Sequence, residues 1–465
     1  MKGDFSRDTF DKTKHFSRVL MQQGRVQLDA DWNEQTAILL HYIRTLAADL
    51  IGPFAGPNGA GLGFEIKTKG NGDSVPADEG FTIGIGRYYV DGILCENFEQ
   101  VTYDKQSNLP NPPPIKDKNN YLVYLDVWER HVTPLEDDYI REKALGGPST
   151  ATRAEIVWQV KHASWPSKWD GAESQFKTMD WWLEKVAEWQ PKLRGCLNAR
   201  VDGAQRSTDP CLTSPEARYR GPENQLYRVE IHAGGKAGGK AGESANGPTF
   251  KWSRDNGSIV TAIEAMNGLL LTVQDPRGFS AGCLVELTSD ELELKGKSGA
   301  LVPVVAMEGN VLTLKDVPSK PASLDKNDEW HPTQARRWDG LAGIVESNDQ
   351  VSGWLPMENG IQIRFQKLDE DGHTYRVGDY WLIPARVATG NIEWPVDDNT
   401  APLPRPPHGV QHHYAPLAAL TWSAETTMWE VKDLRLGFPP CNESRLTSQG
   451  EDGYWGAPRC GNAEA

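Results

Sequence analysis

A regular pattern of apolar residues occupies the stretch from residue 31 to residue 53. Its apolar positions recur at spacings of four, three and four, which places them on one face of an amphipathic helix, close to a coiled-coil seam: Leu39, Ile43, Leu46 and Leu50. The Gly52-Pro53 pair ends this helix. A lone helix with an apolar face needs a surface to pack on, which is either the body of the chain or a neighbouring subunit.

The acidic stretch "DADWNEQ" marks the start of this helix. Asp31 followed three residues later by Glu34 is a capping-box pattern, with Asp in place of Ser or Thr. A helix cap explains both carboxylates without chemistry, and we prefer it to a catalytic pair. Upstream, "RVLMQQGRVQL" predicts two short strands around Gly24. We interpret residues 1–55 as an N-terminal assembly hairpin and helix, with these candidate assembly residues: Asp31, Trp32, Leu39, Ile43, Leu46 and Leu50.

Most of the remaining sequence has the pattern of β-strands. Residues 121–132 alternate between two faces, and one face carries Tyr121, Val123, Leu125 and Val127. Two dipeptides predict tight hairpin turns, Asp91-Gly92 and Asn359-Gly360. A short second helix is predicted at "TMDWWLEKVAEWQ", and "LAALTWSAETTMWEVKDLR" predicts a last hairpin.

These elements predict a mainly β protein, in which an N-terminal hairpin and long helix precede several small β-sheet and β-barrel modules. After the N-terminal part, the pattern divides the chain into five regions: a β domain at 56–165, a β-rich region with a short helix and a Gly/Lys loop at 166–265, a small barrel-like module at 266–325, a C-terminal β region at 326–440 and a loose tail at 441–465.

Charge and composition exclude several classes of partner. The 465 residues carry a formal net charge of −15, which argues against nucleic acid and against an anionic membrane surface. No apolar run approaches the roughly 18 residues that cross a bilayer, so we expect no membrane insertion. The N-terminus has no apolar segment typical of a secretory signal, so we expect synthesis in the cytoplasm.

The six cysteines are scattered, without a CxxC pair. Cys95 and Cys283 lie in apolar strand patterns and are expected to be small buried hydrophobic residues. A reducing cytoplasm keeps thiols free, whereas in an oxidising compartment the other four could form two pairs: Cys196 with Cys211 and Cys441 with Cys460.

Two glycine motifs and one histidine cluster are the candidate ligand sites. Residues 234–241, "GGKAGGKA", nearly match a phosphate-binding P-loop, but Ala241 stands where a Ser or Thr would bind Mg²⁺. Gly84 and Gly86 precede a strand, whereas the glycine motif of a dinucleotide-binding site precedes a helix, so we predict no such site here. The one histidine cluster, which is a candidate for metal binding, is His408, His412 and His413. Gly409 and the preceding prolines argue against a helix that would align these rings, and we prefer structural hydrogen bonding. We predict no cofactor.

The many acidic and tryptophan side chains keep a carbohydrate-binding or glycosidase site as an alternative. Any two of the many carboxylates could form a glycosidase pair, because their separation in space is invisible in sequence: Asp126, Glu129, Asp255, Asp275, Asp290, Asp339 and Asp379. Six tryptophans in strand or turn contexts could stack on sugars, although core packing is the commoner role: Trp128, Trp158, Trp252, Trp338, Trp381 and Trp394. No catalytic signature of a hydrolase is present.

The chain as a whole resembles a bacterial family of unknown function that is encoded among phage-tail-like and extracellular contractile injection system genes. The motifs that carry the resemblance include "HFSRVLMQQGRVQLDADWNEQ", "ENQLYRVEIH", "FKWSRDNGS" and "HGVQHHYAPLA". The Gly/Lys loop and the Trp-rich stretch near Trp181 look like local insertions. The family offers no catalytic residues to carry over, so the resemblance implies a structural component of a particle.

We therefore expect a non-enzymatic structural protein of a phage-tail-like contractile injection particle, located at the baseplate or in a shell or cage around it. Its partners would be further copies of itself and other baseplate or tail proteins, in a particle that is assembled in the cytoplasm and, in one scenario, released outside the cell. The alternative is a particle-borne carbohydrate-binding protein or glycan hydrolase. An exposed tryptophan beside a cleft with two facing carboxylates would favour the alternative, and a large apolar surface at the N-terminal helix would favour assembly.

Overall fold

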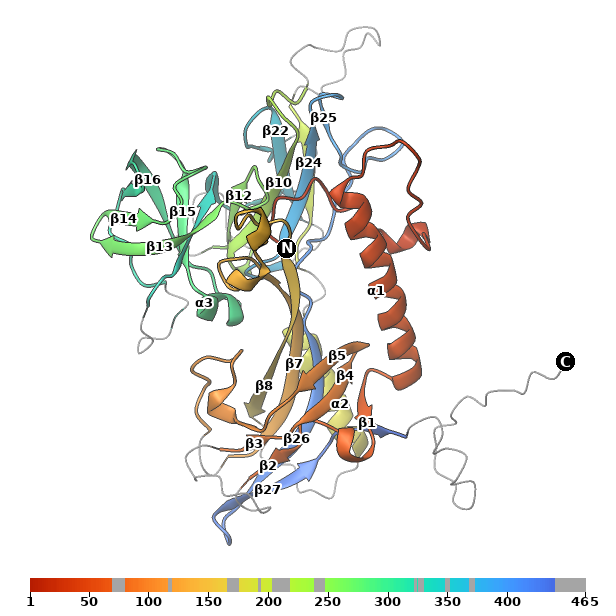
Figure 1. The fold of residues 1–465 in the computed structure, drawn as a ribbon. Helices are drawn as coiled ribbons and strands as arrows, with labels where there is room; N and C mark the ends of the chain where they lie inside the picture. The colour runs from red at the N-terminus through yellow and green to blue at the C-terminus, as the bar shows by residue number, and fades with distance from the viewer. Residues whose placement is uncertain are drawn as a thin grey trace, which may run out of the picture.

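The computed structural model describes residues 1–68, 80–115, 119–164, 175–190, 194–202, 218–237, 247–321, 324, 330–347, 352–367 and 373–439. The protein is mainly β, as predicted. Two groups of sheets lie one above the other, a barrel lies beside the upper group, and the long helix α1 (Asp29–Ile51) runs alongside both groups (Figure 1).

The lower group is built on the antiparallel sheet β27-β26-β7-β8. Its strands are β7 (Tyr121–Val132), β8 (Arg153–Ser164), β26 (His413–Ser423) and β27 (Met428–Asp433). The strand predicted at 121–132 and the predicted last hairpin are both confirmed. Because β26 comes from the end of the chain and pairs with β7, the lower group joins segments about 300 residues apart.

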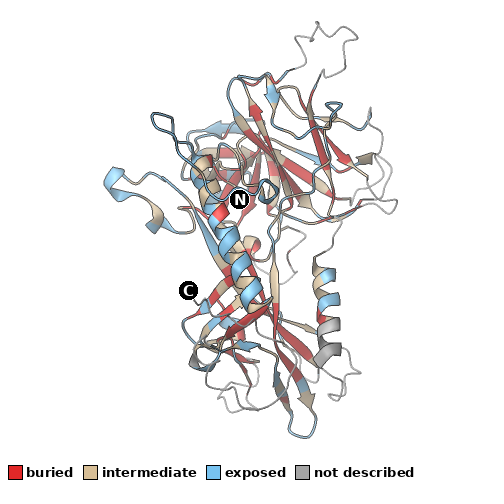
Figure 2. Ribbon diagram, turned by 90° about the vertical axis from the view of Figure 1, so that its right-hand side faces the viewer, coloured by how far each residue is buried: buried red, intermediate tan, exposed pale blue. Residues whose placement is uncertain are grey.

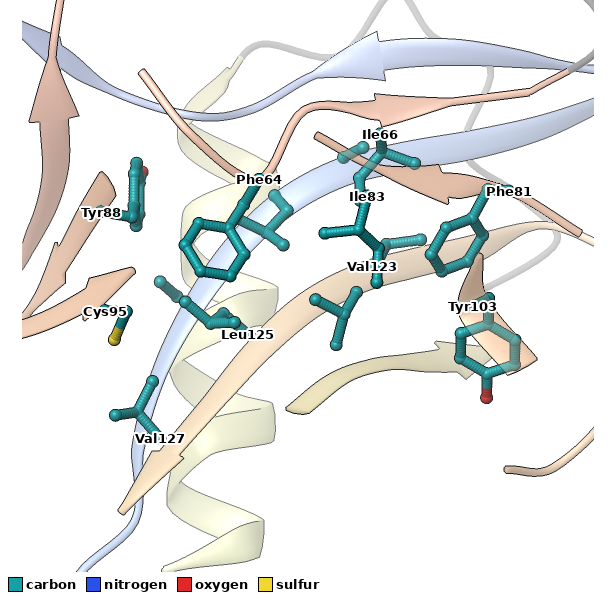
Figure 3. Close-up of a cluster of buried hydrophobic side chains, with 14 of the residues drawn as sticks. Phe64, Ile66, Phe81, Ile83, Tyr88, Cys95, Tyr103, Val123, Leu125 and Val127 are labelled. Atoms are coloured by element: carbon teal, nitrogen blue, oxygen red, sulfur yellow. The ribbon is translucent and has the colours of Figure 1, made fainter. Parts of the chain in front are cut away.

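The two faces of β7 pack in two different cores. The predicted alternation is confirmed, because all four residues of one face lie in the largest buried cluster: Tyr121, Val123, Leu125 and Val127. Figure 3 shows Val123, Leu125 and Val127 of this face against Phe64, which precedes β2, and against side chains from the smaller sheets that include Ile83, Tyr88 and Cys95. The opposite face carries Leu122 and Tyr124 and is covered by α2 (Gln175–Trp189), which buries Trp182 there. The predicted second helix is therefore confirmed.

Two small sheets complete the lower group. One has the order β28-β1-β4-β5 and consists of β1 (Phe54–Pro57), β4 (Gly86–Val90), β5 (Ile93–Asn97) and β28 (Gly437–Phe438). The other has the order β2-β3-β6 and consists of β2 (Ile66–Lys67), β3 (Thr82–Ile83) and β6 (Val101–Thr102). Cys95 is fully buried here, as predicted.

The predicted turn between β4 and β5 is confirmed, and it also contacts α1. Asp91 and Gly92 have φ angles of 48° and 76°, as a two-residue turn of this hand requires. A Cβ atom on Gly92 would lie 2.1 Å from the carbonyl oxygen of Arg44. Glycine is therefore required at this position both for the turn and for the approach of the helix.

The upper group contains a five-stranded sheet with the order β19-β12-β10-β24-β25. Its strands are β10 (Gln225–Ala233), β12 (Thr249–Ser253), β19 (Gly340–Gly343), β24 (Tyr380–Arg386) and β25 (Asn391–Ile392). It packs on β22 (Ile361–Gln366) and the strands that pair with it, β9 (Leu197–Val201), β20 (Glu346–Ser347) and β21 (Leu355–Pro356). A short pair, β11 (Gly235–Lys236) and β23 (Thr374–Tyr375), lies at its edge. The Asn359-Gly360 turn precedes β22, as predicted.

The barrel closes in the order β13-β14-β17-β16-β15-β18. Its elements are β13 (Val260–Asn267), β14 (Leu270–Val273), β15 (Leu284–Thr288), α3 (Asp290–Leu294), β16 (Ala300–Glu308), β17 (Val311–Leu314) and β18 (Gln334–Trp338). The barrel extends beyond the expected limits of 266–325 at both ends, because β13 and β18 pair with each other to close it. Cys283 is buried in its core, as predicted.

A network of buried charges joins the upper sheet to the barrel. Lys251 of β12 donates to both oxygens of Glu286 of β15 at 2.6 Å and lies 3.3 Å from Glu230 of β10. Arg228 donates to Glu230 at 2.5 Å, and Lys2 lies 3.6 Å from the same carboxylate. Burial opposes ionisation of Glu286, but Lys251, Lys2 and His232 together outweigh this effect and lower the pKa of the Glu286 carboxyl group to about 2.

The start of α1 differs from the prediction. The helix begins at Asp29, and its N-cap is Leu28, three residues before the predicted cap and without a side-chain cap. Asp31 makes no hydrogen bond to a described residue through its side chain, and Glu34 accepts from the Thr9 hydroxyl at 2.6 Å. The Asp29 carboxylate, in place of that of Asp31, makes a hydrogen bond at the helix start, where it accepts from the Ser6 amide at 2.8 Å. The predicted cap at Asp31 is therefore wrong, because segment 1–10 folds back onto the helix start.

The predicted hairpin around Gly24 is also wrong. A turn is present, with Gly24 at φ 70° and the Arg25 amide donating to the Gln22 carbonyl at 3.4 Å, but residues 1–28 contain no strand. An isolated two-stranded hairpin is only marginally stable. The segment instead bonds to α1, where the Val19 amide donates to the Gln35 side chain at 2.9 Å.

We predict that the charge network tolerates complete replacement better than partial replacement. Glu286→Gln leaves Lys251 without its main counter-charge and should lower the free energy of unfolding by about 3–5 kcal/mol. A Glu286→Met, Lys251→Met double variant removes both charges of this pair, leaves Glu230 paired with Arg228 and Lys2, and should lie within about 1 kcal/mol of the wild type. Chemical denaturation measures both, and a double variant that is less stable than the single one would contradict this account.

The Lys251–Glu286 pair predicts that the free energy of unfolding depends on pH. The folded pKa of Glu286 is depressed, so its contribution is complete above the ordinary carboxyl value of 4.5 and is lost as the pH falls toward about 2. The stability difference between the wild type and Glu286→Gln should therefore shrink over this window. Denaturation curves at a series of pH values test this, and a difference that stays constant would refute it.

The helix start gives a third prediction. Asp29→Ala removes the acceptor of the Ser6 amide and should cost about 1 kcal/mol of local stability, whereas Asp29→Asn retains an acceptor. Asp31→Ala is the matched control and should cost less than about 0.5 kcal/mol. Amide hydrogen exchange in the first turn of α1 is the measurement. A larger loss for Asp31→Ala than for Asp29→Ala would restore the capping-box interpretation.

Candidate assembly surface

Helix α1 is attached to the rest of the chain by few contacts. Only Ala30 and Ile38 of the helix are buried. Near its C-terminal end, the Arg44 guanidinium donates two hydrogen bonds to Glu129 of β7, at 2.8 and 3.1 Å. This bidentate ion pair and the close approach of Gly92 fix the helix on the lower group.

The predicted apolar seam of α1 is exposed to water. The exposed fractions are 50% for Leu39, 57% for Ile43, 45% for Leu46 and 71% for Leu50. Trp32 is 63% exposed. Figure 2 shows the outer side of α1 as largely exposed along its length. Of the two surfaces considered for the seam, the described part of the chain's own body does not cover it.

The exposed face follows a heptad pattern. Trp32, Leu39 and Leu46 are seven residues apart, and Ile43 and Leu50 form the second row of the seam. The side chains that approach the body lie on the opposite side of the helix, as with Ile38 and Arg44. The helix thus uses one face within the chain and leaves its coiled-coil face free.

Neighbouring residues extend the seam into a larger patch, which we call the N-terminal apolar patch. Among the described residues, the segment 16–50 contains these exposed large apolar side chains: Phe16, Leu20, Met21, Val26, Leu28, Trp32, Leu39, Leu40, Tyr42, Ile43, Leu46 and Leu50. Scattered single apolar residues are normal on a surface, whereas such a concentration of them in one segment makes this segment a candidate interaction surface.

The three candidate metal-binding histidines do not converge. His412 Nδ1 lies 2.7 Å from Asp126, and His413 Nδ1 lies 2.8 Å from Asp91. His408 stacks on Tyr380 with ring centroids 5.6 Å apart. In the part of the chain that the structure describes, no group of three or more His, Cys, Asp or Glu side chains is arranged to hold a metal ion.

The candidate carboxylates each form an ion pair with a basic side chain, and Asp255 and Asp339 share Arg337. Asp126 pairs with Lys161 and Asp290 with Arg130, and the remaining pairs are Glu129–Arg44, Asp255–Arg337, Asp275–Arg277, Asp339–Arg337 and Asp379–Arg194. Although burial raises the pKa of Asp126, the nearby Lys161 and His412 lower it below its usual range. Burial also raises the pKa of Asp379. Arg194 offsets this rise only in part, so the pKa of Asp379 is about 6.

Two of the pockets on the described surface lie near candidate residues. One, of about 660 Å³, lies between the lower sheet and α3 and is lined by residues of both charges, including Asp290, Glu136, Arg130 and Arg153. The other, of about 380 Å³, lies near His412 and His413. None of the six candidate tryptophans lines either pocket: Trp128, Trp158, Trp252, Trp338, Trp381 and Trp394. Trp338 and Trp381 are core residues.

Several sequence predictions fall on other parts of the chain. Residues 238–246 of the Gly/Lys loop, the tail 441–465 and Cys211 lie outside the described residues. Cys196 is described and carries a free thiol. No described helix is both long enough and apolar enough to cross a membrane.

Comparison with known families gives one match that covers most of the chain. One family model, described as "Family of unknown function (DUF6519)", matches residues 1–168 and 185–424. The unmatched stretch between them contains Trp181, where the sequence predicts an insertion, whereas the Gly/Lys loop lies within the match. Comparisons with curated proteins and with solved structures gave no match. Because the match spans most of its length, the chain belongs to this family of unknown function, DUF6519.

Proposed function

We propose that the protein is a structural component of a phage-tail-like contractile injection particle, at the baseplate or in a shell or cage around it, and that the N-terminal apolar patch joins it to its neighbours. The observation that carries the proposal is the exposed seam of α1, with Leu39, Ile43, Leu46 and Leu50 turned away from the chain's own core. The kind of particle rests on the resemblance of the sequence motifs to proteins encoded with such systems.

Burial of the seam would supply substantial binding energy. Each fully buried Leu or Ile side chain contributes about 1.5–3 kcal/mol relative to exposure. A helix with apolar residues at the two seam positions of a heptad packs best against another helix, because each side chain enters a gap between four residues of its partner. A helical partner surface is therefore the natural complement of α1.

A second copy of the chain satisfies this requirement. The positions that flank the seam are Asn33, Leu40 and Ala47 on one side and Gln35, Tyr42 and Asp49 on the other. With one charged residue among them, two copies of α1 would meet without strong like-charge repulsion. The net charge of −15 would then be distributed over the rest of each subunit.

The seam variant Leu39→Asp, Leu46→Asp tests assembly. Because both side chains are exposed in the single chain, the variant should fold with unchanged β-sheet circular dichroism and unchanged unfolding. Association would bury two unpaired charges, so oligomers and particle incorporation should be lost. Size-exclusion chromatography with light scattering and particle pull-down measure this.

Leu145→Asp combined with Leu403→Asp is the control, since both leucines are exposed but lie outside the N-terminal apolar patch. This control should assemble like the wild type. Normal assembly of the seam variant would refute the assembly role of α1, and loss of folding in the seam variant would show that the patch is covered within the chain.

A further inference from the structure

The pocket of about 380 Å³ lies where five segments of the chain meet. It is formed by the end of α2, the segment that leads into β9, the turn between β23 and β24, the segment that leads into β26, and the β4–β5 turn. Its lining is polar, with Val410 as the one apolar residue: Asp91, Gln190, Arg194, Arg376, Val410, Gln411, His412 and His413.

The two arginines of this pocket differ in how they are held. The Arg194 guanidinium donates to Asp379 at 3.0 Å, and this carboxylate is only 2% exposed. A buried carboxylate therefore orients Arg194 from behind the pocket. Arg376 is half-buried and makes no ion pair with any described residue. Its hydrogen-bond donors are available to a ligand.

The carboxylates around the pocket are already engaged. Asp91, the one carboxylate in the lining, accepts from His413 at 2.8 Å. His412 contacts the buried Asp126 at 2.7 Å, and Lys161 neutralises the same carboxylate at 2.7 Å. Asp126 is offset by Lys161 and Asp379 by Arg194, which leaves Arg376 as the basic side chain of the lining without an ion pair to a described residue.

We propose that this pocket binds a small molecule through an oxyanion group, carboxylate or phosphate, which Arg194 and Arg376 hold together. Guanidinium groups match the planar or tetrahedral oxygens of these anions with paired N–H donors. The Gln411 amide supplies a further neutral donor in the lining, whereas the Gln190 amide donates to the His412 carbonyl. The volume is within the range of small-molecule sites. The proposal is independent of assembly through α1.

Isothermal titration calorimetry of the full chain with inorganic phosphate and, separately, with citrate tests the proposal. One saturable site with a dissociation constant on the order of 1 mM or tighter is expected for at least one of them. Arg376→Gln removes one guanidinium and should weaken binding about tenfold or more. Binding of phosphate alone would identify a phosphate ligand, and binding of citrate alone a carboxylate ligand.

Two further variants sharpen the test. Arg277→Gln removes the same charge at an exposed site and should bind like the wild type. Gln411→Glu places a carboxylate at an exposed position of the lining, so it should abolish binding while leaving the fold intact. No saturable binding of either anion by the wild type, or equal binding by Arg376→Gln and the wild type, would overturn the proposal.

Discussion

Two buried carboxylates, Glu230 and Glu286, lie between the upper sheet and the barrel, and the arrangement of the upper half depends on their neutralisation. A buried charge without a partner is strongly unfavourable, so Lys251 has to occupy the position between them. Lys2 reaches the same network from the start of the chain. The network therefore fixes the barrel on the sheet and also anchors the segment that leads into α1.

From this anchor, the N-terminal segment runs to the lower group while burying little apolar surface. Polar contacts hold α1 at both ends, through Asp29 with Ser6 and through Arg44 with Glu129. Such contacts position a helix, but they do not remove its apolar face from water. The seam thus remains exposed in the single chain, and a partner that covers it would gain the hydrophobic free energy that the chain itself leaves unused.

Local patterns in the sequence predicted the elements whose causes are local. The alternation of β7, the Asp91-Gly92 turn and the heptad spacing of α1 each depend on neighbouring residues, and each was found as expected. The predicted capping role of Asp31 is wrong because the amide of Ser6, 23 residues before Asp29 in the chain, donates to the Asp29 carboxylate instead. The Arg44–Glu129 and Lys251–Glu286 pairs, and the pocket of Arg194 and Arg376, arise from tertiary structure that no local pattern encodes.

We propose that another chain covers the N-terminal apolar patch in the assembled state of the protein. Hydroxyl-radical footprinting of the isolated chain and of the assembled state compares side-chain accessibility directly. The account predicts that labelling of Trp32, Leu39, Ile43 and Leu46 falls on assembly, while labelling of Tyr139, which is 86% exposed and outside the patch, stays the same. Unchanged labelling of the seam in the assembled state would contradict it.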